Sequence, residues 1–318
     1  MKLFSDKLPE VRSDEELQTL MSLHPGYDPG YLCQSSSVLR VKTKSWMEKL
    51  WKQYQPYADS HFLEEFKHQF TQRSWELYLG VTLLKNGLKL GLQKNDGPDF
   101  EILNGEGKRL AWIEAIAVTK GTGNDRVPDL LYGEVSSIPT DEMVLRIANG
   151  LAVKYQKYCS YINNGFIEKD DPYVIALDRS QLEHVDALLP NILKALFGIG
   201  TLALHIRVGG KRVKRPKSSW TSQFEIKKRS GSSVPMLFFE NPEHAGISAV
   251  IYTQDHVINS PRGPKQMGQN FTIVHNPHAR NPLPDSFFPF GDEHRAEEGY
   301  VRKIRKRKAF RKPNPFPY

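Results

Sequence analysis

Two carboxylates, Asp99 and Glu114, flank a glycine-rich turn in the stretch NDGPDFEILNGEGKRLAWIEAIAVTKG, residues 95–121. Glu114 is the only acid in an apolar, strand-like run, and a buried charge is costly unless it is paired. Residues that pair across an antiparallel hairpin have numbers with a constant sum, so a turn at 105–108 places Asp99 directly opposite Glu114. Like charges so placed repel, and a cation between them resolves the repulsion. Ligation by oxygen alone favours a hard ion, Mg²⁺ or Mn²⁺.

A structural role is the alternative for both acids. A slip of one residue in the register would move the carboxylates to different faces of the hairpin. A lysine or arginine paired with each acid would also satisfy the charges without a metal. Pro98 fits the start of a strand beside a turn, because proline cannot donate to a strand ladder.

The elements that must position these carboxylates follow from the hydrophobic periodicity. The predicted elements are, in order, a helix over 61–86, a strand over 88–93, the two strands of the hairpin, a helix over 140–161, a strand over 172–178, a helix over 181–197 and a strand over 201–208. Short strand candidates follow in QFEIKK, MLFF, AVIYT and FTIVHNP. This alternation predicts the α/β class.

By pattern the chain divides into four parts. The predicted parts are a helical and loop region over 1–60, an α/β core over 61–210, a β-rich extension over 211–300 and a basic tail over 301–318.

Pro98-Asp99 followed by Glu114, within a helix, three strands, helix and strand, resembles the PD-(D/E)XK nuclease superfamily, which has the restriction-endonuclease-like fold. The resemblance covers roughly residues 65–210. It implies that Asp99 and Glu114 bind a divalent metal, and that a lysine two residues after the glutamate positions or activates the attacking water. Here that position is Ile116. Strand alternation puts residue 116 on the face of the carboxylates, so the substitution calls activity into question.

Within the superfamily this lysine also comes from a neighbouring element, and Lys154 is the candidate replacement. It lies in the helix predicted over 140–161, inside a broad apolar face between Leu151 and Tyr158. A lysine there needs either a carboxylate partner or a route to solvent along the edge of the face. Lys157 and Lys120 are weaker candidates.

Glu76 is the third acid of interest, because it borders the apolar stripe of the helix predicted over 61–86. Several branches of the superfamily take an extra acidic metal ligand from this helix, so the resemblance implies that role for Glu76. An ion pair with Arg73, three residues earlier, is the alternative. Two further signals are weaker: a second Pro-Asp pair at 128–129, and the His-Asn-Pro-His run at 275–278, whose histidines more often serve the structure.

The net charge of +8 is concentrated near the C-terminus. The segment VRKIRKRKAFRK carries eight basic residues and no acid, and the rest of the chain has equal numbers of bases and acids. A second basic cluster occupies 211–217. Such clusters bind polyanions, nucleic acid above all, through the phosphates. The residues expected to contact nucleic acid are Lys211, Arg212, Lys214, Arg215, Arg305, Lys306, Arg307 and Lys308. A solubilising tail is the alternative.

The composition excludes several classes. Hydrophobic residues make up 39% of the chain and charged residues 25%, which is typical of a globular protein. The two cysteines, Cys33 and Cys159, belong to no Cys/His cluster, which argues against a disulfide scaffold or a thiolate zinc site and suits a reducing cytoplasm. No apolar run could span a bilayer and no secretion signal is present, so we expect a cytoplasmic protein without a membrane partner.

These patterns predict an α/β protein with a restriction-endonuclease-like core and a β-rich C-terminal extension. The expected activity is metal-dependent hydrolysis of phosphodiester bonds in DNA or RNA, with Mg²⁺ or Mn²⁺ as the cofactor. One alternative is a nuclease-like module without catalysis that binds nucleic acid or serves assembly. A second is a protein-interaction domain with no nucleic-acid role. A homodimer is left open, because paired cuts in a duplex usually need two active sites.

Overall fold

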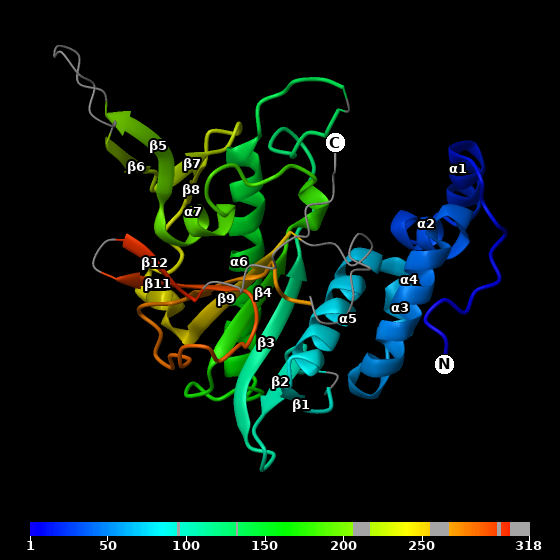
Figure 1. Ribbon diagram of the computed structural model, residues 1–318, viewed down its shortest axis with the longest axis horizontal. Helices are drawn as coiled ribbons and strands as arrows, with labels where there is room; N and C mark the ends of the chain where they lie inside the picture. The colour runs from blue at the N-terminus through cyan, green and yellow to red at the C-terminus, as the bar shows by residue number, and fades with distance from the viewer. Residues whose placement is uncertain (94–95, 132, 206–216, 255–266, 298–299, 306–318) are drawn as a thin grey trace, which may run out of the picture.

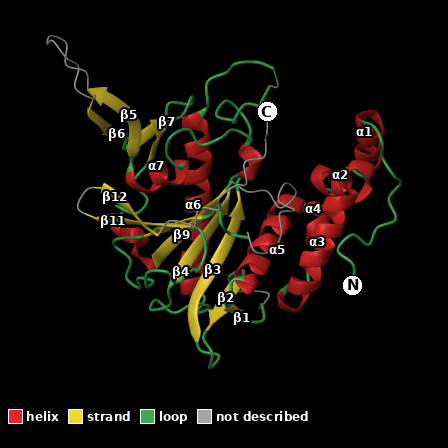
Figure 2. Ribbon diagram, in the orientation of Figure 1, coloured by secondary structure: helices red, strands yellow, loops and turns green. Residues whose placement is uncertain are grey.

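An eight-stranded mixed sheet forms the centre of the protein, with helices against both faces (Figure 1, Figure 2). The computed structural model describes residues 1–93, 96–131, 133–205, 217–254, 267–297 and 300–305. The strand order in the sheet is β1-β2-β3-β4-β9-β10-β11-β12. Its strands are β1 (Lys89–Leu90), β2 (Phe100–Leu103), β3 (Arg109–Ala117), β4 (Tyr173–Asp178), β9 (Ile247–Thr253), β10 (Thr272–His275), β11 (Asp292–Glu297) and β12 (Tyr300–Arg305).

Strand directions change along the sheet. β1, β2 and β3 form an antiparallel meander, whereas β3, β4 and β9 run parallel to one another. β10 is antiparallel to β9 and parallel to β11, and β12 closes the far edge antiparallel to β11. All residues of β4 are buried, which suits a strand with neighbours on both edges and helices on both faces.

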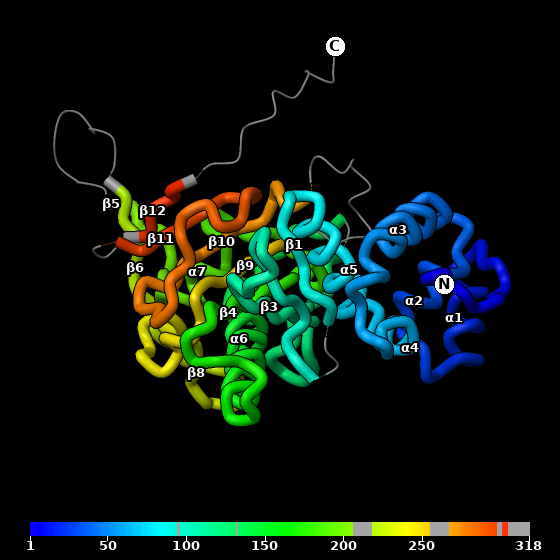
Figure 3. Tube along the Cα trace, turned by 90° about the horizontal axis from the view of Figure 1, so that it is seen from below, coloured from blue at the N-terminus to red at the C-terminus, as the bar shows by residue number. Residues whose placement is uncertain are grey.

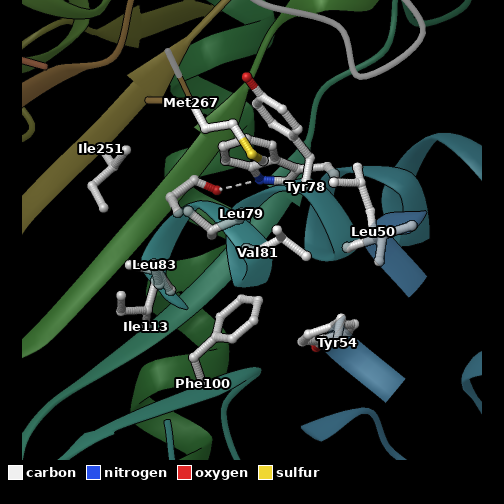
Figure 4. Packing of buried hydrophobic residues seen from close by; sticks show 14 of the residues in the cluster. Leu50, Tyr54, Tyr78, Leu79, Val81, Leu83, Phe100, Ile113, Ile251 and Met267 are labelled. Carbon is white, nitrogen blue, oxygen red and sulfur yellow. Dashed lines mark hydrogen bonds between the residues drawn. The ribbon is translucent and has the colours of Figure 1, made fainter. Parts of the chain in front are cut away.

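The N-terminal helices cover one face of the sheet. They are α1 (Asp14–Leu23), α2 (Pro29–Ser36), α3 (Val41–Tyr54), α4 (Phe62–His68) and α5 (Phe70–Lys85), with short 3₁₀ turns at η1 (Val38–Arg40) and η2 (Gln55–Tyr57). α5 lies against the sheet and α3 packs against α5, and the ring of Tyr54 on α3 reaches past α5 to the ring of Phe100 on β2 (Figure 4). Residues 1–60 therefore share one hydrophobic core with the sheet.

The opposite face is covered by α6 (Thr140–Asn163) and α7 (Asn191–Phe197), with η3 (Ser180–Leu182) and η4 (Pro242–Gly246) nearby. Gly150 lets α6 approach β3 closely, because a Cβ there would lie only 2.7 Å from Cγ1 of Val118. This close approach brings Lys154, one turn later on α6, within hydrogen-bond distance of Glu114 on β3.

Two small hairpins complete the described structure: β5 (Ile199–His205) with β6 (Lys217–Ser222), and β7 (Glu225–Lys227) with β8 (Ser233–Pro235). The β5–β6 hairpin lies at the opposite end of the molecule from the N-terminal helices (Figure 3). Within the described part of the chain, no helix is long and apolar enough to cross a membrane.

The predicted α/β class and the order helix, three strands, helix, strand are both observed. Several details differ. The helix predicted over 61–86 is two helices, α4 and α5, and the strand predicted over 88–93 is reduced to the two residues of β1. The helix predicted over 181–197 is reduced to α7, which starts directly after Pro190, a residue that a helix interior would not tolerate. The strand predicted over 201–208 corresponds to β5, which pairs with β6 outside the main sheet, and residues 206–208 lie outside the described residues. MLFF is not a strand, because its aromatic residues pack in a turn beneath α6 and α7.

The main sheet contains strands from both sides of the boundary predicted at residue 211. β9 comes from the part set aside as a β-rich extension, yet it lies directly beside β4, and β10 and β11 continue the same sheet. Periodicity detects strands but not which distant strand each one joins, so the sequence could not place β9.

Candidate active site

The hairpin of β2 and β3 has the register that the sequence predicts. Phe100 pairs with Ile113 and Glu101 with Trp112, so continuation of the ladder by one residue sets Asp99 opposite Glu114. A bulge between Ile102 and Leu103 absorbs an extra residue near the turn and leaves the ladder at Asp99 unchanged.

Glu114 is fully buried and lies between two lysines from α6. Nζ of Lys154 and Nζ of Lys157 are each 2.7 Å from the same oxygen, Oε1 of Glu114. The hydroxyl of Tyr161 lies 3.3 Å from the other oxygen, Oε2, and 3.0 Å from the carbonyl oxygen of Gly97, so two acceptors share its one hydrogen. Lys154, Lys157 and Tyr161 follow the i, i+3, i+7 spacing of one helix face, which explains why all three reach one carboxylate.

Ile116 packs against the core beneath α6, in the position where the resemblance implies a lysine. The amines beside Glu114 are supplied by α6 instead. Lys154 is buried and its side chain does not extend to solvent, so the alternative of a lysine at the edge of the apolar face is excluded. The partner that its buried position requires is Glu114.

β2 begins at Phe100, which pairs with Ile113, and beyond this pair the side chain of Asp99 covers part of the edge of β3. Its Oδ2 accepts a hydrogen bond from the backbone N–H of Ala115 at 2.7 Å. Gln72 of α5 covers the next part of this edge, donating to the carbonyl of Ala115 and accepting from the N–H of Ala117. The second oxygen of Asp99, Oδ1, accepts no hydrogen bond from the described part of the chain.

The electrostatic environment of Asp99 is unfavourable for a charged carboxylate. Burial raises its pKa well above the ordinary value, and the nearby carboxylates of Glu114 and Glu76 raise it further, against the smaller opposing effects of Lys154 and Lys157. Two lysines therefore do not compensate all the negative charge in this region, and a cation beside Asp99 would lower this pKa.

Glu76 is buried and forms an ion pair with Arg73, which is 2.6 Å away. Arg73 also binds Asp59, at 2.8 Å, and Glu65. The pKa of Glu76 is raised, because burial outweighs the lowering by Arg73. The ion pair weighed as the alternative for Glu76 is thus present, although Glu76 is also close enough to act on the charge of Asp99.

A polar cavity of roughly 320 Å³ opens beside Asp99. Its lining residues are Asp59, His61, Glu65, Arg73, Gln93, Asp96, Gly97, Asp99, Lys157 and Tyr161. Two separate sets of ion pairs border it: Arg73 with Asp59, Glu65 and Glu76, and Lys154 and Lys157 with Glu114. Asp96 and Asp99 form no ion pair within the described residues, so the carboxylates around the cavity outnumber the cations, which favours a bound cation.

The donor atoms suit a hard divalent ion in their chemistry. Asp99 Oδ1 and Glu114 Oε2 are carboxylate oxygens that lack a short hydrogen bond within the described residues. Asp99, Glu114 and Glu76 do not, however, form a set of three carboxylates with oxygens within 4.8 Å of one another. Glu76 is drawn away by Arg73 and Gln72, so the structure brings Asp99 and Glu114 together and holds Glu76 in its own ion pair.

The weaker sequence signals have other partners. Lys120 forms ion pairs with Asp129 and Glu183, so the second Pro-Asp pair belongs to a surface network. His275 contacts Glu293 and His278 contacts Glu240, far from Glu114 in the strand order. Lys211, Arg212, Lys214, Arg215, Lys306, Arg307 and Lys308 lie outside the described residues, and of Arg305 only the backbone, at the end of β12, is described.

Tyr161, Gln72 and Asp59 were not found from the sequence. Tyr161 could have been found by extending the face of Lys154 and Lys157 by one turn. Nothing in the sequence signals Gln72 and Asp59, because their roles depend on how α5 and residue 59 sit against β3. Comparisons with protein-family models, with curated proteins and with solved structures find no significant match to the chain.

Proposed function

We propose that the protein is a metal-dependent nuclease that hydrolyses phosphodiester bonds of DNA or RNA. The observation that supports this most directly is the group formed by Asp99, Glu114 and two lysines beside a polar cavity. The register puts the two carboxylates opposite each other, and α6 supplies the amines that Ile116 cannot. A group of this kind, with carboxylates for a metal and cations for the phosphate, can support the hydrolysis of a phosphodiester.

Asp99 and Glu114 would hold Mg²⁺ or Mn²⁺, with Glu76 as an outer carboxylate. The ion would lower the pKa of a bound water and stabilise charge on the phosphate. Lys154 and Lys157 fix the Glu114 carboxylate and orient the attacking water. Burial alone would lower the pKa of Lys157, but Glu114 and Asp99 raise it overall, so its amine stays protonated and acts as a donor rather than a base.

The test is cleavage of labelled single- and double-stranded DNA and RNA with Mg²⁺ or Mn²⁺. Asp99→Asn and Glu114→Gln should each abolish cleavage. Glu101→Gln is the matched control, because Glu101 lies on the same hairpin and pairs with Arg109 outside the group. Cleavage that survives both site variants, or that Glu101→Gln removes equally, would contradict the proposal.

A second candidate is a nuclease-like module that binds nucleic acid without cutting it. It is favoured by Ile116 and by the two lysines that already neutralise Glu114. This candidate predicts salt-dependent binding to oligonucleotides with no cleavage under any metal. The two candidates agree on Lys211, Arg212, Lys214, Arg215 and residues 305–308 as phosphate contacts, so binding alone does not distinguish them.

A further inference from the structure

A second group of ligating side chains lies on the β10–β11 part of the sheet. His275, Asp285 and Glu293 each offer one ligand atom, and the three atoms lie within 4.8 Å of one another. Among the described His, Cys, Asp and Glu residues this is the only group of three that meets this criterion. β4 and β9 separate it from the β3 strand of Glu114, so it is a separate site.

His275 is almost fully buried, and one of its ring nitrogens is unsatisfied. Nε2 lies 2.7 Å from Oε1 of Glu293, while Nδ1 has no hydrogen-bond partner in the described part of the chain. The hydrogen between Nε2 and Oε1 holds the ring against Glu293. An ion bound by both atoms would take the place of this hydrogen, and the neutral imidazole would then carry its hydrogen on Nδ1.

Asp285 lies in the connection between β10 and β11, which is held to the sheet by hydrogen bonds to Glu293. β10 and β11 are parallel, and residues 276–291 connect them without any helix or strand, whereas parallel strands are usually joined through a helix. Within this connection Ser286 has a positive φ of 62°, an uncommon conformation for a residue other than glycine. Its N–H donates to both carboxylate oxygens of Glu293, at 2.9 and 3.1 Å.

Glu293 therefore contacts His275 on one side and the turn that carries Asp285 on the other. Asp285 also accepts a hydrogen bond from Arg295 at 2.5 Å, so one cation already offsets part of the charge of the two acids. The side chain of Asp285 is largely exposed, whereas those of His275 and Glu293 are buried, so the group opens to solvent only on the side of Asp285. The ligand atom of Asp285 lies within 4.8 Å of those of His275 and Glu293.

We propose that His275, Asp285 and Glu293 bind a divalent transition metal ion, for which Zn²⁺ is the best match. One imidazole nitrogen with two carboxylates suits Zn²⁺ and disfavours Mg²⁺, which prefers oxygen alone. The ion fixes the connection 276–291 to the β10–β11 pair. This site is independent of the proposed nuclease activity, and its ion preference differs from that of Asp99 and Glu114.

The test is calorimetric titration of Zn²⁺ into the full chain and four variants. The double variant Asp99→Asn/Glu114→Gln removes the other candidate site, and Asp285→Asn removes an exposed ligand without creating a cavity. Glu240→Gln is the matched control, since Glu240 is a half-exposed acid 3.3 Å from His278 and outside the group. His275→Gln is the fourth variant, and circular dichroism verifies its fold.

The wild type, the double variant and Glu240→Gln should each bind about one Zn²⁺ per chain, and Asp285→Asn should bind roughly tenfold or more weakly. Cobalt(II) should give visible d–d absorption in the wild type that is lost in folded His275→Gln. If the wild type binds no Zn²⁺, or if Asp285→Asn binds as tightly as Glu240→Gln, the site does not exist. If the double variant keeps the circular dichroism spectrum of the wild type and alone fails to bind, the zinc belongs to the group at Glu114 and the proposal is overturned.

Discussion

Lys154 on α6 and Glu114 on β3 are 40 residues apart in the chain and form a buried ion pair, with 2.7 Å between Nζ and Oε1. This pair explains how the apolar strand β3 can retain a single acid at its centre. The charge is compensated from α6, which packs on the face of the sheet to which Glu114 points, and a second lysine on α6, Lys157, also lines the cavity. The structural and catalytic interpretations of Glu114 thus rest on the same contacts. They differ in whether the cavity binds a metal ion and a phosphodiester.

Glu114→Gln should destabilise the protein, because it leaves two ammonium groups without their counterion. Loss of one partner of a buried pair costs about 3–5 kcal/mol. Urea denaturation measures this cost. In the double variant Glu114→Gln/Lys154→Met the loss should be smaller than the sum of the two single losses, since the buried amine is then absent as well. Additive losses would mean that Lys154 and Glu114 do not interact energetically.

Asp99→Asn should stabilise the metal-free protein at neutral pH. Burial and the neighbouring acids raise the pKa of Asp99 in the folded state, so the folded protein keeps this proton to a higher pH than the unfolded chain. The stability that protonated Asp99 contributes is present below the unfolded pKa and is lost as pH rises through the folded pKa. The gain from Asn should accordingly appear above about pH 4 and vanish below it.

Divalent ions should reverse this order of stability. With Mn²⁺ at about 100 times its dissociation constant, the wild type should gain about 2.7 kcal/mol of stability, while Asp99→Asn should gain little. Thermal unfolding in EDTA and in Mn²⁺, from pH 4 to pH 8, measures both effects. A wild type that Mn²⁺ leaves unchanged, at concentrations where cleavage is assayed, would argue against a metal at Asp99.

Lys154→Met and Lys157→Met should separate stability from activity. Lys154 is buried, so its removal should cost about 1–3 kcal/mol. Lys157 is partly exposed at the cavity, so its removal should cost under about 1 kcal/mol. Both should lower kcat by roughly a hundredfold or more if the amines orient the water. If Lys157→Met cleaves at the wild-type rate, the role falls to Lys154 alone.

Deletion of residues 306–318 should weaken nucleic-acid binding and flatten its salt dependence. The deleted segment contains Lys306, Arg307, Lys308, Arg311 and Lys312. Each of these side chains that binds a phosphate should add about 0.9 to the slope of log K against log salt on duplex DNA, so the deletion should reduce the slope by that amount per phosphate. Fluorescence anisotropy across a salt series measures the slope. An unchanged slope would assign the tail a solubilising role.

The local part of this structure could be predicted from the sequence. The register between Phe100 and Ile113 followed from alternation and from the position of the turn, because both depend on neighbouring residues. The two lysines could be placed on one helix face for the same reason. How far α6 lies from β3 could not be predicted, since it depends on Gly150 meeting Val118. The sequence therefore ranked Lys154 above Lys157, whereas both amines lie 2.7 Å from the same oxygen of Glu114.

The long-range part was not accessible. β9 pairs with β4 along its length, but the sequence between them gives no signal of this pairing. The i, i+3 spacing indicates the ion pair of Arg73 with Glu76. It does not indicate the ion pair of Arg73 with Asp59, which depends on the packing of α4 and α5. Pairings that depend on tertiary packing are weakly encoded by local pattern.

The position of β9 beside β4 has a consequence for synthesis. β3 and β4 emerge from the ribosome early, yet β4 lacks one edge partner until β9 has been made. At about 5–20 residues per second the intervening chain takes several seconds. During that time a largely apolar strand presents an open edge, the kind of edge that chaperones and other nascent chains bind. The rate of translation between residues 178 and 247 should therefore influence how much of the protein reaches its folded form.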